Sequence, residues 1–564
     1  MRTIFLRNKT DLAFFLLLAP VSSCLSILFA LSLEPIVTAA IEKNGSMLWE
    51  AVCWCALMAL FDAVFEVFRQ KQKIRLVNKC ESSLRDMLSQ GMADRSIFEF
   101  QKRDSSWYLS LFHNDTQRMK DTYFAGVCNL YQSVWSLLLS ILAIGMMNLW
   151  ITIFLLVIGI ISICLPKLFE GRLLSSQETQ SKAADRHMSV LKDFLNGFWI
   201  IKEHHIEKKQ LETYQDVNRQ LTGANVANQY LPYWIGWISA NITTAAFVGV
   251  LALSAVFSIQ GKIEVGMLLS LSQLIGGILV PFESIPTYLS GIKGCKEIKS
   301  KMADCLPREG TNIRLLENKK WERIEFQGIQ FAYEGAGEEK NILQNLNFVI
   351  ERGKKYVILG KSGSGKSTLA KILVGIYPAG YELLIDGRPC DPQILQEKCS
   401  YQEQNVFLFQ DTVWNNVTLY KNMREEEVKE VLRALNFSEE YMETKDFLQM
   451  NVGENGSSVS GGERQRLGLA RELLDRKEIL ILDEFTANLD PKTAEQIESV
   501  VMGLKDTTCI MITHRQDSEM VRRCDAILVM KEGELIERGN HDELMKRQGE
   551  YYTLFSTQAK LYTD

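Results

Sequence analysis

Several common signatures are missing from this sequence. Its formal net charge is only −5 over 564 residues, which excludes the strongly basic balance of a nucleic-acid-binding protein. No pair of cysteines has the CxxC spacing, and no group of cysteines and histidines has the spacing of metal ligands. The twelve cysteines follow no pairing pattern, which is typical of buried thiols in a reducing compartment.

A cleavable signal peptide is not expected, although the chain starts with a basic segment. The uncharged stretch 12–33 is 22 residues long, which exceeds the apolar core of a signal peptide. It is long enough to cross about 30 Å of hydrocarbon. We therefore expect a first transmembrane helix at 12–33.

Charge is absent from further long stretches of the first half. Residues 122–166 hold 45 uncharged positions, about twice what one crossing needs, so they predict two spans joined near Asn148. The stretch 220–261 is too long for one crossing and predicts a helix that extends into water. Glu283 and Pro286 are expected to interrupt the last span. The six predicted spans are 12–33, 50–70, 122–147, 149–170, 231–259 and 265–290.

Lysine and arginine predict the orientation of these spans. Segments 69–120 and 167–219 are rich in both residues, whereas the connections at 34–48, 148 and 258–264 are nearly free of them. Positive loops remain in the cytoplasm, so both termini are predicted to be cytoplasmic. The two basic segments are long and helical in pattern, and we expect their helices to extend well beyond the membrane.

The second half has the pattern of a soluble α/β domain. A polar stretch at 307–326 precedes the β-rich runs KYVILG, EILILDE, TCIMITH and AILVM, which alternate with helical patterns. This alternation predicts a largely parallel sheet covered by helices. The predicted organisation is a membrane domain at 1–305, a linker at 306–320 and an α/β domain at 321–564.

A phosphate-binding loop is the strongest local signal. The stretch GKSGSGKST follows an apolar strand and precedes a helical pattern, as the G-x-x-x-x-G-K-[ST] motif requires. Backbone amides of such a loop converge on phosphate oxygens, Lys366 neutralises the β- and γ-phosphates, and Ser367 binds Mg²⁺. The predicted nucleotide-binding residues here are Gly360, Lys361, Ser362, Gly363, Ser364, Gly365, Lys366, Ser367 and Thr368.

Two later strands end in residues suited to hydrolysis. ILILDE ends in Asp483, which suits the Mg²⁺ shell, and Glu484, which can polarise the attacking water. MITH ends in His514, a position from which a side chain can contact a γ-phosphate. The three residues follow the phosphate loop in the order expected of an ATP-hydrolysing site.

These motifs, together with VSGGERQR, resemble the nucleotide-binding domain of ATP-binding cassette (ABC) transporters. VSGGERQR occupies the place of the family's signature motif, and the resemblance implies that it covers the γ-phosphate of ATP held by a second domain. One chain would then hold one half of each of two sites. The implied signature residues are Ser460, Gly461, Gly462 and Glu463.

The resemblance extends over nearly the whole chain and assigns further roles. It implies that Tyr333 stacks on adenine, that Gln404 lies near Mg²⁺ and the attacking water, and that Asp490 belongs to the D-loop. Two basic segments of the membrane half resemble loops that carry coupling helices. The implied fold is an all-α, six-helix transmembrane domain followed by an α/β P-loop ATPase domain, in the exporter arrangement.

Three residues depart from the family pattern, and they affect whether the partner is expected to be a copy of this chain or a related chain. Glu463 stands where glutamine is usual and Val459 where leucine is usual, and a carboxylate near phosphate could weaken that half-site. Asn488 replaces the usual alanine of the D-loop. The resemblance implies ATP and Mg²⁺ as ligands and a second half-transporter as partner, either a copy of this chain or a related chain. No N-terminal peptidase domain is expected.

The substrate is less well specified by the sequence. Asp62, Glu66 and Glu283 lie in or beside predicted spans, where acids are costly; they indicate either a cavity for cationic amphiphiles or hydrogen bonds between helices. The aromatics of 230–237 fit an interfacial belt or a drug-contacting surface. We expect export of a drug, lipid or peptide across a bacterial plasma membrane; alternatives are an importer of exporter architecture and a non-pumping channel or regulatory subunit.

Overall fold

The chain folds into two compact units in the computed structural model, which describes residues 1–307, 321–332, 341–444, 446–516 and 518–561. The first unit comprises Met1–Asp94 and Arg103–Glu309, and the second comprises Arg95–Lys102 and Gly310–Asp564. A short segment of the predicted membrane half therefore groups with the second unit.

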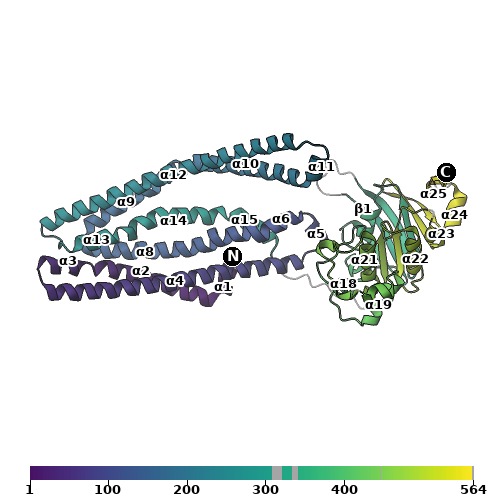
Figure 1. Cartoon of the computed structure of the whole chain (residues 1–564), viewed down its shortest axis with the longest axis horizontal. Helices are drawn as coiled ribbons and strands as arrows, with labels where there is room; N and C mark the ends of the chain where they lie inside the picture. Colours follow the sequence, from purple (N-terminus) through teal and green to yellow (C-terminus); the bar gives the residue numbers. More distant parts are fainter. Residues whose placement is uncertain (308–320, 333–340, 445, 517, 562–564) are drawn as a thin grey trace. The chain divides into compact units, whose positions relative to one another are not determined.

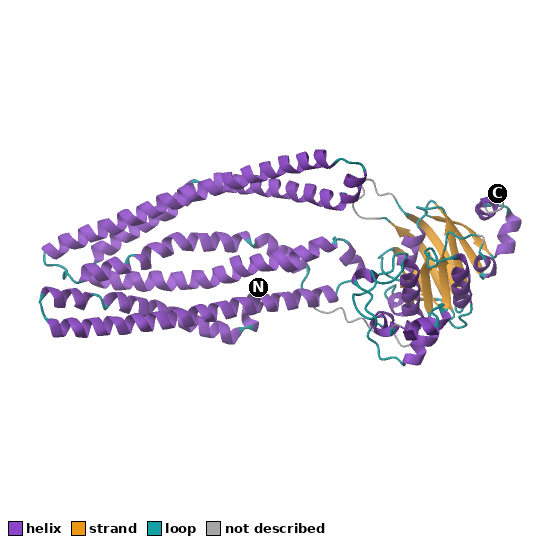
Figure 2. Cartoon of the chain, in the orientation of Figure 1, coloured by secondary structure: helices purple, strands orange, loops and turns teal. Residues whose placement is uncertain are grey.

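The first unit is entirely helical in its described part (Figures 1 and 2). Its elements are α1 (Arg2–Arg7), α2 (Lys9–Leu31), α3 (Glu34–Ile41), α4 (Gly45–Ala93), α6 (Ser105–Ser110), the π-helical turn η1 (Leu111–Asp115), α7 (Thr116–Arg118), the π-helical turn η2 (Met119–Phe124), α8 (Ala125–Met147), α9 (Leu149–Leu168), α10 (Glu170–Asn196), α11 (Phe198–Glu203), α12 (Glu207–Ile259), α13 (Met267–Leu274), α14 (Gly276–Gly294) and α15 (Lys296–Asp304).

Five helical runs among the described residues are long and apolar enough to cross a membrane. They are Lys9–Ile41, Gly45–Ala93, Ser105–Met147, Glu207–Ile259 and Met267–Asp304, and a shorter apolar helix covers Leu149–Cys164. Each of the six predicted spans falls on one of these helices. Helices α4 and α12 hold 49 and 53 residues, about 75 Å each, so they extend far beyond a hydrocarbon core of about 30 Å.

The last span differs from the prediction. Glu283 and Pro286 were expected to interrupt it, but α14 continues through both of them and also through Pro281. A proline removes one backbone hydrogen bond, and neighbouring helices in a bundle make that loss tolerable. Helices α13 and α14 meet at Ile275, whose backbone is itself helical, so they belong to the single run Met267–Asp304.

Small residues allow the helices of this unit to pack closely. A Cβ atom built on Gly277 of α14 lies 2.1 Å from Ser140 Oγ and 3.0 Å from Ser140 Cβ on α8. Similar close approaches occur between Gly159 and Phe282 and between Gly249 and Phe154. Contacts of this kind stabilise helix pairs in lipid. The hydrophobic effect does not drive helices together there, so close van der Waals packing must do so.

The second unit contains two sheets in its described part (Figure 2). The mixed sheet has the strand order β10-β9-β3-β8-β7-β6, and the antiparallel sheet has the order β2-β1-β4-β5. The strands are β1 (Arg323–Phe331), β2 (Leu343–Glu351), β3 (Lys355–Gly360), β4 (Gly380–Ile385), β5 (Arg388–Cys390), β6 (Cys399–Gln402), β7 (Ile479–Asp483), β8 (Thr508–Ile512), β9 (Ala526–Lys531) and β10 (Glu534–Gly539).

Helices cover these sheets and fill the connections between strands. They are α5 (Ile97–Gln101), α16 (Lys366–Leu373), α17 (Ile394–Lys398), α18 (Val413–Thr418), α19 (Glu425–Ala434), α20 (Glu439–Thr444), η3 (Phe447–Gln449), η4 (Glu454–Gly456), α21 (Gly461–Asp475), α22 (Pro491–Met502), α23 (Glu519–Arg523), α24 (His541–Arg547) and α25 (Glu550–Leu561).

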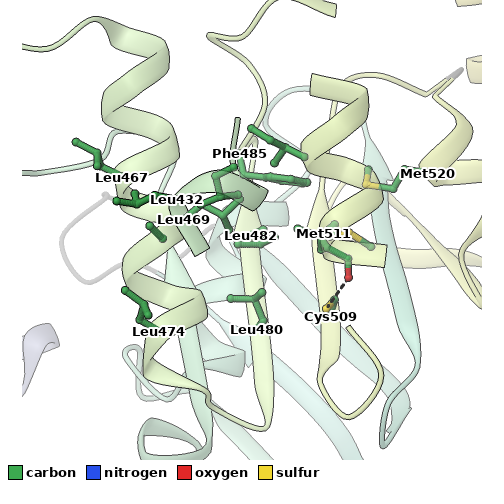
Figure 3. Packing of buried hydrophobic residues seen from close by; sticks show 14 of the residues in the cluster. Leu432, Leu467, Leu469, Leu474, Leu480, Leu482, Phe485, Cys509, Met511 and Met520 are labelled. Carbon is green, nitrogen blue, oxygen red and sulfur yellow. Dashed lines mark hydrogen bonds between the residues drawn. The ribbon is translucent and has the colours of Figure 1, made fainter. Parts of the chain in front are cut away.

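The parallel strands are buried on both faces, which explains their unbroken apolar runs. Successive side chains alternate between two cores: Leu480 and Leu482 of β7 join the core with α21, and Ile479 and Ile481 join the core with α16. Figure 3 shows Leu480 and Leu482 beside Leu467, Leu469 and Leu474 of α21. This packing fixes the ends of the strands, where the predicted functional residues lie.

Helix α5 is the part of the first half that groups with the second unit. Phe98 packs against the core beside Tyr377, with ring centroids 5.7 Å apart in an edge-to-face arrangement. Lys102 lies over the ring of Phe98. The first predicted coupling loop therefore carries a short helix that is anchored by an aromatic side chain.

We expect Gly277→Val to destabilise the membrane unit, because its side chain would collide with Ser140. Overpacking of this kind typically costs about 1–3 kcal/mol. Gly276→Val is the matched control, since a Cβ atom on Gly276 meets nothing within 4 Å. Thermal unfolding of the detergent-solubilised protein should show a lower Tm for Gly277→Val alone; equal Tm values for the two variants would contradict this packing.

Candidate nucleotide site

The phosphate loop joins β3 to α16. Its glycines adopt left-handed backbone conformations, with φ of +79° at Gly363 and +96° at Gly365. A Cβ atom on Gly360 would lie 2.3 Å from the carbonyl oxygen of Met530, so no larger residue fits there. A Cβ atom on Gly363 meets nothing within 4 Å, so the tip of the loop is not packed against another element at this residue. Such a loop suits the close approach of phosphate to backbone amides.

Lys366 is held across this loop. Its ammonium group donates to the carbonyl oxygens of Gly360 and Lys361, at 2.9 and 3.0 Å, and its side chain is buried. Burial lowers the pKa of Lys366, and the nearby carboxylates of Glu484 and Asp483 oppose that shift. The positive charge therefore lies at the base of the loop, at the N-terminus of α16, where an anion is favoured.

Asp483 has the geometry of a metal ligand. Its Oδ1 atom is buried and has no hydrogen-bond partner among the described residues. Burial raises the pKa of this carboxyl, while hydrogen bonds from Ser367 and Tyr401 lower it. An unpaired buried oxygen costs free energy unless a ligand satisfies it, and Mg²⁺ prefers carboxylate and hydroxyl oxygens. Asp483 and Ser367 therefore fit a magnesium ion.

Glu484, Gln404 and His514 come together as the sequence predicts for a hydrolytic site. Gln404 Nε2 donates to Glu484 Oε2 at 2.7 Å, and His514 Nε2 lies 2.8 Å from Glu484 Oε1. Glu484 has a φ of +48°, which is uncommon for a residue other than glycine. Strained backbone of this kind is often found where a side chain must be aimed at a ligand.

The signature residues form the N-terminus of α21. Ser460 is the N-cap residue, and its side chain accepts from the backbone N–H of Glu463 at 3.2 Å. The Glu463 carboxylate in turn accepts from the Ser460 backbone N–H at 2.8 Å, which completes a capping box. Gly461 and Gly462 are the first two residues of the helix, so their amides point out of its N-terminus.

Gln465 links the signature helix α21 to Glu484 at the end of β7. The sequence motif did not predict this role. Its Nε2 atom donates to the Glu484 carbonyl oxygen at 2.8 Å, and its Oε1 atom accepts from the Asn488 backbone N–H at 3.0 Å. The side chain is buried. Asn488 thus contacts Gln465 through its backbone N–H and not through its side chain. This hydrogen bond joins the D-loop to the signature helix within one chain.

Asp490 of the D-loop caps a helix. Its side chain accepts from the Thr493 backbone N–H at 3.0 Å, at the start of α22. Hydrogen bonds at Thr493 lower the pKa of this exposed carboxyl. Tyr333, the predicted adenine-stacking residue, lies outside the described residues.

Tyr401 is a second residue that sequence reasoning missed. It lies on β6, and its hydroxyl donates to Asp483 Oδ2 at 3.4 Å. This contact lies on the opposite oxygen from the unpaired Oδ1 atom. The signal in the sequence is weak, because a tyrosine in a buried strand is usually a core residue.

The acids predicted for a substrate cavity do not form one cluster. Ser22 donates to Glu66 at 3.1 Å and Glu66 also pairs with the buried Arg69, whereas Ser26 donates to Asp62 at 2.6 Å. Glu283 accepts from Thr243 at 2.7 Å. Each hydrogen bond from a hydroxyl donor joins two helices, α2 with α4 or α12 with α14, whereas the Glu66–Arg69 pair lies within α4.

Each half of the chain matches a known protein family. The ABC transporter transmembrane region matches residues 12–282, and the ABC transporter ATPase family matches residues 343–487. The two segments together make up more than half of the chain. The chain belongs to the ABC transporter family. It is an exporter-type half-transporter in which a helical membrane domain is fused to an ABC ATPase domain, which confirms the predicted family, fold class and enzyme class.

Individual relatives agree with this assignment. A Bacillus subtilis protein named as the multidrug export ATP-binding/permease protein YgaD is 26% identical, over 94% of this chain and 93% of that protein. An ATP-dependent lipid A-core flippase of Haemophilus ducreyi is 33% identical, but the match covers only 55% of each chain. A bacterial Atm1-family ABC exporter solved with ATP bound has the same fold, with a TM-score of 0.83, 21% identity and 98% coverage of both chains.

We expect Tyr401→Phe to weaken the response of the ABC transporter's ATPase to magnesium. Losing a hydrogen bond of about 0.5–1.5 kcal/mol leaves Asp483 less well oriented, so half-saturating Mg²⁺ should rise about two- to tenfold. Tyr381→Phe is the matched control, because the Tyr381 hydroxyl has no partner among the described residues. Unchanged magnesium dependence in Tyr401→Phe would contradict the assignment.

Proposed function

We propose that this chain is an ATP-driven exporter that works as a dimer of half-transporters. The observation that carries the proposal is the Glu484 carboxylate held between Gln404 and His514, near Lys366 of the phosphate loop. A carboxylate fixed in this way can orient a water molecule for attack on a γ-phosphate. The helical unit of the same chain supplies the membrane path.

The phosphate loop and the residues around it have distinct roles in this proposal. The amides of the loop and Lys366 would bind the β- and γ-phosphates, and Ser367 and Asp483 would hold Mg²⁺, with Gln404 as a further candidate ligand. When bound, Mg²⁺ neutralises the charge that develops on the phosphate oxygens. Lys366 already lies at the loop in the free protein, so little reorganisation is needed.

Hydrolysis uses Glu484 as the proton acceptor. Water attacks the γ-phosphorus, the bond to the β–γ bridging oxygen breaks, and ADP and phosphate form. Glu484 takes the proton that the attacking water loses, while Gln404 and His514 keep both carboxylate oxygens in place.

A second chain completes the sites. The signature residues carry outward-pointing amides at the N-terminus of α21, which suits ATP bound to another chain's loop. On α11, Phe198, Trp199 and Ile200 are 51%, 77% and 57% exposed, and such apolar patches usually mark a protein contact. Opening and closing of the paired ATPase domains would drive the alternation of the membrane domains.

We favour a copy of this chain as the partner. Glu463 raised the alternative of a different chain, because a loose carboxylate would oppose phosphate binding. In the structure both of its oxygens accept hydrogen bonds within the ATPase unit, so the altered motif does not require a specialised partner. The related-chain alternative predicts that this chain alone is inactive.

For the substrate, we propose an amphiphilic drug or lipid, the classes in the names of its relatives. Among the membrane acids, Glu66 is balanced by Arg69 of its own helix and accepts from Ser22 of α2, so it serves mainly to join α2 and α4. Asp62 and Glu283 accept only neutral hydroxyl donors in the described contacts and are the stronger candidates for attracting a cationic group. An importer of the same architecture would differ in the direction of flux.

The proposed function is tested with the chain expressed alone in nanodiscs. We expect a native mass equal to two chains, Mg-dependent ATPase activity and loss of that activity in Glu484→Gln. A monomer, or an inactive dimer, would contradict the homodimeric exporter. Substrate-stimulated uptake into inside-out vesicles, where export points inward, then distinguishes export from import.

Glu283→Gln should lower the transport of a cationic dye several-fold while ATPase activity is retained. The substitution keeps the hydrogen bond from Thr243 but removes the charge. Glu66→Gln should instead lower thermal stability, because the buried Arg69 loses its counter-charge. Unchanged dye transport in Glu283→Gln would exclude this carboxylate from the substrate path.

A further inference from the structure

The Glu463 carboxylate is held by two different donors. Its Oε2 atom accepts from the Ser460 backbone N–H at 2.8 Å, and its Oε1 atom accepts from the Tyr441 hydroxyl at 2.7 Å. Tyr441 lies on α20, some twenty residues before the signature motif. The carboxylate is thus tied to its own N-cap residue and to a neighbouring helix.

The neighbouring arginines do not replace this tyrosine as a donor. Arg466 donates to the carbonyl oxygens of Asn436 and Leu435 at 2.7 and 3.3 Å, and it stacks on Phe437 at 4.1 Å. Arg464 donates to the carbonyl oxygen of Gly456 at 3.0 Å. The hydrogen bonds that these two guanidinium groups make go to those carbonyl oxygens, while the Nε atom of each is buried without a partner among the described residues.

Charge makes the position of Glu463 important. Burial raises the pKa of its carboxyl, but the hydrogen bonds from Tyr441 and Ser460, together with the positive charge of Arg466, lower the pKa below the ordinary value. The group is therefore ionised at neutral pH. A rotation that brought it toward the N-terminus of α21 would place a negative charge beside any phosphate bound there.

The capping box leaves the signature able to bind. Ser460 Oγ accepts the Glu463 N–H, and the Ser460 hydroxyl also interacts with the Glu463 carboxylate. The amides of Gly461 and Gly462 are not used within the helix. The anion site is complete as long as the Glu463 side chain stays turned back.

We propose that Tyr441 is a positioning residue of the signature motif, whose hydroxyl holds the Glu463 carboxylate away from the partner-bound γ-phosphate. This inference rests on the proposed function, since it concerns ATP held by a second copy of the chain. It also explains how the motif accepts glutamate in place of glutamine. Tyr441 is fixed in turn by Phe447, with ring centroids 5.2 Å apart.

The test is a double-mutant cycle with Tyr441→Phe and Glu463→Gln in the full chain in nanodiscs. We measure KM and kcat for ATP. On a Glu484→Gln background we also measure the ATP concentration that traps half of the protein with occluded radiolabelled ATP. Tyr441→Phe should raise KM and the half-trapping concentration about three- to tenfold, with a smaller change in kcat.

The Glu463→Gln background distinguishes positioning from packing. With the charge removed, adding Tyr441→Phe should change neither value further. If Tyr441→Phe changes KM and the half-trapping concentration equally on both backgrounds, Tyr441 has a packing role. If it changes neither on the wild-type background, Tyr441 has no role in ATP binding. Either result overturns the inference. Tyr420→Phe is the matched control, because it also loses a tyrosine–carboxylate hydrogen bond, to Asp411 at 2.8 Å, away from the signature.

The same experiment separates this inference from the proposed function. If the wild-type chain neither hydrolyses nor traps ATP, both are overturned. If the wild-type chain traps ATP and Tyr441→Phe behaves identically, only the role of Tyr441 is overturned. A shift in Tyr441→Phe that Glu463→Gln abolishes supports both.

Discussion

The alignment of parallel strands is the constraint on which the nucleotide site depends. In the sheet, Ile358 of β3 pairs with Ile512 of β8, and Ile512 pairs with Asp483 of β7. The residues that follow this row are therefore brought to one edge: the phosphate loop after β3, Glu484 after β7 and His514 after β8. Gln404 follows β6, the next strand along, so a shift of register by one residue in any strand would separate the group.

The phosphate loop and the signature residues, the two parts of the proposed composite site, lie in different regions of the ATPase unit. The phosphate side lies at the ends of the strands, while the signature amides lie at the N-terminus of α21 and point out of the domain. Gln465 connects the two regions through Glu484 and Asn488, so the state of the hydrolytic edge can affect the surface offered to a second chain. The Tyr441–Glu463 contact adjusts that same surface from the side of α20.

Sequence reasoning predicted most of the hydrolytic site, because its residues lie within short motifs at strand ends. Glu484, Gln404 and His514 were expected close together and are in contact. Tyr401, Tyr441 and Gln465 were missed, because their partners are distant in sequence and depend on packing between elements. The charge of Glu463 was noticed; its hydrogen bond from the Ser460 N–H belongs to a local capping box, whereas its hydrogen bond from Tyr441 depends on the position of α20.

The membrane half was predictable in outline and less so in detail. Apolar lengths located the helices, but α14 continues through Glu283 and Pro286, because helix packing outweighs local proline preference. The grouping of α5 with the ATPase unit had no composition signal, since it depends on where Phe98 finds a core. The close approach at Gly277 likewise follows from the neighbouring helix and not from its own sequence.

Complementation between two inactive chains tests the central claim that each site takes one part from each chain. Lys366→Ala removes the phosphate side, and Ser460→Arg blocks the signature side. Each variant alone should be inactive as a homodimer, because every site then carries one defect. When the two are co-expressed, mixed dimers contain one intact site, and ATPase activity should return; no recovery in isolated mixed dimers would contradict the account.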